Sequence, residues 1–208
     1  MIGHEYIAML ITDRFPIDTN HLLKQDQTLS FSGMSWEDYE ELSLETNRGY
    51  RISFCNGVIT LMSPSQNHER IKDFIFLLIV TYCDAVELDY YPTGSTTFKD
   101  QDRQVGKEPD CSFCFNSLKD IPDLAIEVVF SSGGIQDLEK YKKLGVKEVW
   151  FWINGKLEIY VLNNNIYQRN NYSFNLSKLE DNLLTKYISQ ALNNNPRTLK
   201  KSFFEELH

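Results

Sequence analysis

The chain has 208 residues, of which 42% are hydrophobic and 13% aromatic, a composition typical of globular and not of disordered proteins. Its formal net charge of −8 disfavours bulk attraction to nucleic acid, although a local basic groove stays compatible with that charge. Apolar runs such as residues 74–80 fall short of the ~20 residues that span a bilayer, and the N-terminus lacks a signal-peptide pattern, so we expect one cytoplasmic domain, without a membrane span, over residues 1–208.

The first half of the chain predicts two helices separated by a β-hairpin, after an irregular segment over residues 1–33. Ser35, followed by Asp38 three residues later, is typical of a helix start. Asn56-Gly57 lies between two strand-like runs and predicts a type I′ hairpin turn. Apolar residues at helical spacing then predict a long helix over residues 66–83.

The second half of the chain predicts further strands and three more helices. In chain order we expect short strands on either side of 92–94, a polar loop over 102–109, and strands at 110–115 and 123–130. A helix over 135–145 follows, and then a hairpin of strands 148–153 and 156–162. The chain ends with an edge strand within 163–174 and helices near 180–192 and 197–206. This order predicts an α/β or α+β domain with a mixed sheet.

Glu127 is the first candidate site residue, because it interrupts the apolar strand LAIEVVF. A carboxylate buried there costs several kcal/mol unless it is paired, protonated or bound to a metal. Asp110 begins the preceding strand, and if the two strands are neighbours, both carboxylates reach one point at the sheet edge. Such a pair either shares a proton or binds a cation, and Mg²⁺ prefers oxygen ligands. A buried salt bridge from Glu127 to a lysine is the alternative interpretation.

Lysines follow this strand on the predicted helix over 135–145. A lysine beside the acidic pair would orient water or stabilise charge on a phosphoryl transition state. Lys140 lies three residues after Asp137, so both belong to roughly one helical face. The alternative for such lysines is the solvated face of a short helix.

Several separated motifs resemble those of the Uma family of putative restriction endonucleases, within the PD-(D/E)XK nuclease superfamily. The resemblance extends over about residues 34–165. Its motifs, in the family's order, are Asn56-Gly57, Met62-Ser63-Pro64, Asn67-His68, Pro109-Asp110, Ile121 to Val128, and Gly145 to Trp150.

The resemblance implies a restriction-endonuclease-like core over about 34–165 with flanking helices and β-hairpins. The predicted closing helices form a C-terminal helical extension over about 178–208. The resemblance also implies Mg²⁺- or Mn²⁺-dependent hydrolysis of DNA phosphodiester bonds by a homodimer. Asp110 and Glu127 would be metal ligands and Lys140 the catalytic charge stabiliser. His68 and Glu69 are possible additional site residues.

The sequence also departs from the family's pattern. The lysine expected two residues after the strand glutamate is Val129, and the lysine expected in relatives with this turn is Asp137. The hairpin glutamate is Ser53 and the turn aspartate is Asn56. These departures leave open an impaired or inactive family member that acts as a nucleic-acid-binding or protein-interaction module.

Overall fold

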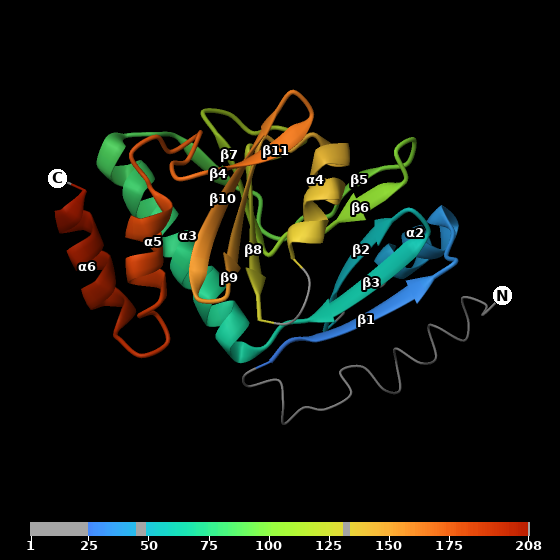
Figure 1. The fold of residues 1–208 in the computed structure, drawn as a ribbon, viewed down its shortest axis with the longest axis horizontal. Helices are drawn as coiled ribbons and strands as arrows, with labels where there is room; N and C mark the ends of the chain where they lie inside the picture. Colours follow the sequence, from blue (N-terminus) through green and yellow to red (C-terminus); the bar gives the residue numbers. More distant parts are fainter. Residues whose placement is uncertain (1–24, 45–48, 131–133, 208) are drawn as a thin grey trace.

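The computed structural model describes residues 25–44, 49–130 and 134–207, and these form two β-sheets with helices packed on them (Figure 1). In the described part of the chain, no helix combines the length and the apolar character needed to cross a membrane.

The first sheet is antiparallel throughout. Its strands, in spatial order, are β1 (Gln27–Ser32), β3 (Val58–Ser63), β2 (Arg51–Cys55), β6 (Val105–Lys107) and β5 (Phe98–Asp100). The β2–β3 turn has positive φ at both Asn56 (51°) and Gly57 (77°), as a type I′ hairpin requires, which confirms the predicted turn.

The second sheet is mixed. Its strands, in spatial order, are β11 (Ile166–Asn170), β10 (Lys156–Asn163), β9 (Glu148–Ile153), β8 (Leu124–Val129), β7 (Cys111–Phe115) and β4 (Tyr90–Pro92). Only β8 and β9 run parallel among these strands, because the chain crosses between them through a 3₁₀ turn, η2 (Ile135–Asp137), and helix α4 (Leu138–Leu144).

The helices cover three sheet faces. Helix α2 (Trp36–Leu44) packs on the first sheet, and its predicted cap is present: the Ser35 N–H donates to Asp38 (2.8 Å) and the Asp38 N–H to Ser35 Oγ (3.1 Å). Helices α3 (Gln66–Val86) and α5 (Asp181–Ile188) cover one face of the second sheet, α4 covers the other, and α6 (Pro196–Glu206) packs on α3 (Figure 1).

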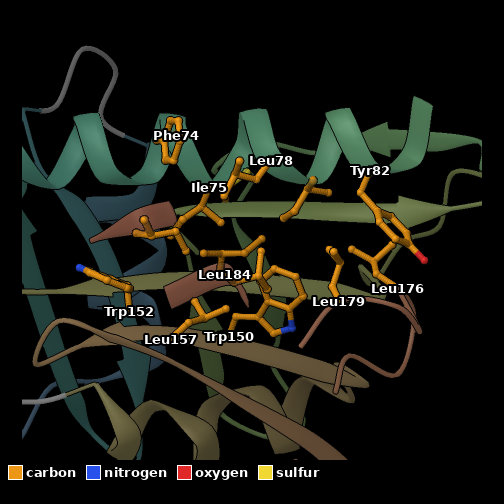
Figure 2. Packing of buried hydrophobic residues seen from close by; sticks show 14 of the residues in the cluster. Phe74, Ile75, Leu78, Tyr82, Trp150, Trp152, Leu157, Leu176, Leu179 and Leu184 are labelled. Atoms are coloured by element: carbon orange, nitrogen blue, oxygen red, sulfur yellow. The ribbon is translucent and has the colours of Figure 1, made fainter. Parts of the chain in front are cut away.

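The largest core lies between α3 and the second sheet. Ile75, Leu78 and Tyr82 of α3 point toward Trp150 and Trp152 of β9 (Figure 2). Both tryptophans are buried, so they serve the core and not an exposed surface for stacking on bases. This packing holds β8 and β9 rigidly under the helix, and β8 carries Glu127.

The structure confirms the mixed α/β class and corrects two local predictions. Residues 27–32 form β1 although 1–33 were expected to be irregular; alternating Leu29 and Phe31 were the available signal, and residues 1–24 lie outside the described range. The expected polar loop over 102–109 contains β6, a buried strand between β2 and β5. Three residues are too few to show a periodicity, so the polar composition misled the prediction.

Candidate active site

A cavity of about 480 Å³ lies between the two sheets and the η2–α4 segment. Its wall combines side chains from β2, β6, β8, η2 and α4. The charged and polar residues of this wall include Arg51, Ser53, Lys107, Glu127, Asp137 and Lys140.

The two strands that carry the predicted acidic pair are neighbours. In the antiparallel β7–β8 pair, Cys111 lies opposite Ile126. Continuing this register by one residue sets Asp110 opposite Glu127, at the end of the ladder. The structure thus brings the two acids together, as the sequence predicted, but it gives them different surroundings.

Asp110 is enclosed by hydrogen-bond donors and cations. Its side chain is 0% exposed, and its Oδ2 accepts the Val128 N–H (2.6 Å) and lies 2.9 Å from His68 Nε2. Its Oδ1 lies 2.7 Å from Arg51 Nη1. Burial opposes ionisation of Asp110, but the charges of Arg51 and His68 outweigh it and hold the pKa of this carboxyl well below its usual range.

His68, on the first turn of α3, lies between the side chains of Asp26 and Asp110. Its Nε2 faces Asp110, and its Nδ1 lies 2.9 Å from Asp26 Oδ2. Burial lowers the pKa of His68, yet the two aspartates more than compensate and raise it to about 9. His68 is fully buried, contacts Asp110 and does not itself line the cavity.

Glu69, the other additional candidate, contacts Arg51 from α3. Its Oε1 accepts a hydrogen bond from Arg51 Nη2 (2.8 Å) and its Oε2 one from Lys72 (2.6 Å). Arg51 is thereby held between two acids, Glu69 and Asp110. Glu69 is half-buried and does not line the cavity, so the structure places it one contact away from the site.

Glu127, unlike Asp110, lines the cavity. Its Oε1 accepts a hydrogen bond from the Tyr141 hydroxyl and lies 3.1 Å from Lys107 Nζ. Its Oε2 has no hydrogen-bond or ionic partner among the residues that the structure describes. Burial is the main cause that raises the pKa of Glu127 to about 7, and the neighbouring charges of Asp110 and Asp137 add to it against the opposing effect of Lys107.

Asp137 lines the cavity and contacts two lysines. Lys107 Nζ lies 2.9 Å from its Oδ2, and Lys140 Nζ lies 2.8 Å from its Oδ1. Lys140 also donates to Ser53 Oγ (2.9 Å), which connects α4 to β2 of the first sheet. The predicted common face of Asp137 and Lys140 is confirmed, and Lys140 does reach the cavity.

Of the two acids predicted to hold a divalent cation, Glu127 lines the cavity and Asp110 does not. The Asp110 side chain is closed off: its Oδ2 accepts the Val128 N–H, and its Oδ1 has the ionic contact with Arg51 but no hydrogen bond from the described residues. Within the described ranges, no three His, Cys, Asp or Glu side chains are grouped so as to hold a metal. The difference arises because Arg51 and His68 already neutralise Asp110.

Sequence reasoning missed three residues of this constellation: Arg51, Lys107 and Tyr141. Arg51 begins β2 just before the hairpin, and Tyr141 seemed only an apolar contact of α4. Lys107 was assigned to a loop. The one available signal was its place two residues before Pro109, next to the Pro-Asp motif.

One comparison with known proteins, the scan against family models, identifies a family. The sequence model of Uma2, described as "Putative restriction endonuclease", matches residues 36–192. No curated protein matches the chain. Among solved structures, a protein of Anabaena variabilis ATCC 29413 described as a putative nuclease belonging to DUF820 is 13% identical, with 72% of this chain and 97% of that chain covered and a TM-score of 0.49.

Proposed function

Because this chain belongs to the Uma2 family of putative restriction endonucleases, we propose that it is a nuclease that hydrolyses DNA phosphodiester bonds in the cavity beside Glu127. One observation carries the proposal: a buried carboxylate opens onto a cavity that it shares with the ammonium groups of Lys107 and Lys140. Negative charge develops on the phosphoryl oxygens during hydrolysis, and fixed cations in a dry site stabilise such charge most effectively.

The resemblance predicts Mg²⁺ or Mn²⁺, and Glu127 is the residue that would hold it. Magnesium sites commonly use one or two carboxylates together with water and phosphate oxygens, so Glu127 alone is a sufficient protein ligand. Such an ion would activate the attacking water and neutralise charge on the scissile phosphate.

The other candidate residues receive different roles. Lys140, held by Asp137 and Ser53, presents its charge to a phosphate in the cavity. Asp110 is a positioning residue, since it binds the N–H of Val128, the residue next to Glu127, and anchors Arg51. Asp110 thus sets the direction in which Glu127 points.

Plasmid nicking in Mg²⁺, Mn²⁺ or EDTA tests the proposal. We expect nicking by the wild-type protein with either metal, and a loss of about 100-fold or more in Glu127→Gln. The exposed Glu205→Gln on α6 is the matched control and should nick at the wild-type rate. Equal rates for Glu127→Gln and the wild type, or a wild type that never nicks, would reject the nuclease assignment.

A second candidate, an inactive family member that binds nucleic acid or protein, is favoured by the enclosure of Asp110. Arg51 and His68 neutralise this acid inside the protein, so the charge of the predicted two-carboxylate site is already satisfied. Calorimetric titration with Mn²⁺ separates the candidates: binding that Glu127→Gln abolishes supports the nuclease, and no binding together with no nicking supports the inactive member. The homodimer stays a prediction that sedimentation equilibrium measures.

A further inference from the structure

Lys107 reaches the site from the opposite sheet. It ends β6 of the first sheet, and its Nζ lies 3.1 Å from Oε1 of Glu127 on β8 of the second. Helix α4 packs against β6 and against the second sheet, which brings the two strands to one cavity (Figure 1). The Lys107 side chain is 9% exposed and lines that cavity.

Asp137 stands where relatives with this turn are expected to carry a lysine, and the structure shows what the acid does instead. Its Oδ2 lies 2.9 Å from Lys107 Nζ, so it anchors a lysine that comes from elsewhere in the chain. A lysine this deeply buried keeps its charge only with close acidic partners, and Lys107 has two, Asp137 and Glu127.

On the basis of the proposed nuclease function, we propose that Lys107 is the catalytic lysine of this site, supplied from β6 and held in place by Asp137. Lys140 contacts Asp137 and Ser53, whereas Lys107 contacts Glu127 directly, so Lys107 is the ammonium group beside the acid. Asp137 and Lys107 together thus supply the ammonium group that a lysine at position 137 is expected to provide in relatives.

Lys107 keeps its proton throughout the hydrolysis step that it assists. Water attacks phosphorus, one P–O bond forms and the bond to the leaving ester oxygen breaks. The proton of the water passes to solvent, and the leaving oxygen takes up a proton from solvent. Lys107 stays an ammonium group throughout and stabilises the charge that accumulates on the non-bridging phosphoryl oxygens.

Moving the lysine tests the proposal. Lys107→Met should nick about 100-fold more slowly and melt about 6 °C or more below the wild type, because Glu127 and Asp137 lose their shared cation. The double variant Lys107→Met/Asp137→Lys returns a lysine to the expected position. It should recover nicking to within about tenfold of the wild type and much of the melting temperature.

Lys142→Met is the control, since Lys142 pairs with Glu139 on the same helix and does not line the cavity; its nicking and melting temperature should match the wild type. Wild-type nicking by Lys107→Met overturns the proposal. If that variant does not fold, the double variant decides: folded and active supports the proposal, folded and inactive overturns it.

The melting temperatures also separate this inference from the nuclease assignment. If the wild type never nicks, the assignment fails while the pairing is still tested. In that case the catalytic role of Lys107 fails as well. Recovery of the melting temperature in the double variant then supports only that positions 107 and 137 can each supply the lysine paired with Glu127, and additive losses overturn that pairing.

Discussion

At the scale of single residues, two neighbouring carboxylates differ because their partners differ. Burial is the largest influence on both, and by itself it favours the protonated acid. Asp110 escapes this effect through Arg51 and His68, so its pKa falls. Glu127 faces one lysine and two other acids, so its pKa rises, and it is the acid that still gains from an added cation.

This difference predicts that metal binding tightens with rising pH. A ligand carboxylate must lose its proton before it binds a cation, and the pKa of Glu127 is raised to about 7. From pH 6 to pH 8 the ionised fraction of Glu127 rises, so the association constant for Mn²⁺ should rise about tenfold and then level off. Calorimetric titrations at both pH values measure it. In Glu127→Gln binding should be lost at both pH values; Mn²⁺ binding that persists there would place the metal elsewhere.

At the scale of elements, β6 is a short strand whose position depends on one glycine. A Cβ built on Gly106 would lie 2.1 Å from Tyr39 Oη and 2.3 Å from its Cζ. Tyr39 is fully buried in α2 and stacks on Phe54 of β2. Gly106 therefore lets the helix approach the sheet on one side while Lys107 turns toward the cavity.

We predict that Gly106→Ala destabilises the fold by about 2–3 kcal/mol, because a rigid ring leaves no room for the added methyl group. Urea denaturation measures the change. The added Tyr39→Leu substitution should make the loss less than additive, since it removes the ring. Gly49→Ala should change stability by less than about 0.5 kcal/mol, because no atom of the described residues beyond its chain neighbours lies within 4 Å of its Cβ position. Equal effects of the two alanines would refute this account.

At the scale of the whole molecule, Asp110 joins both sheets and the long helix. It enters β7 of the second sheet, binds the backbone of β8, and contacts Arg51 of the first sheet and His68 of α3. Glu69, also on α3, holds the other side of Arg51. The ionic network is therefore a structural joint as well as the inner wall behind the cavity.

Asp110→Asn should cost on the order of 3 kcal/mol, because it leaves buried Arg51 and His68 without their common anion. Urea denaturation at pH 7 measures the loss, with exposed Asp102→Asn as the control.

The pKa of His68 is raised to about 9, so the stabilising contribution of its pairing with Asp110 is complete below the ordinary pKa of 6.5 and is lost as the pH rises through 9. Part of the difference between wild type and Asp110→Asn should therefore disappear by pH 10. If Asp110→Asn is as stable as the wild type at pH 7, Asp110 does not stabilise the contact between the two sheets and α3.

The sequence by itself determined the features that depend on residues close together in the chain. The Ser35–Asp38 cap and the Asn56-Gly57 turn follow from local hydrogen bonding and backbone freedom. The sequence put Asp110 and Glu127 on two strands, and the tertiary structure made these strands neighbours. Only the tertiary structure decided which acid is open, because ionic partners come from distant segments. Arg51 and Lys107 reach Asp110 and Glu127 from the other sheet, and no local pattern in a sequence encodes which opposite charges meet in space.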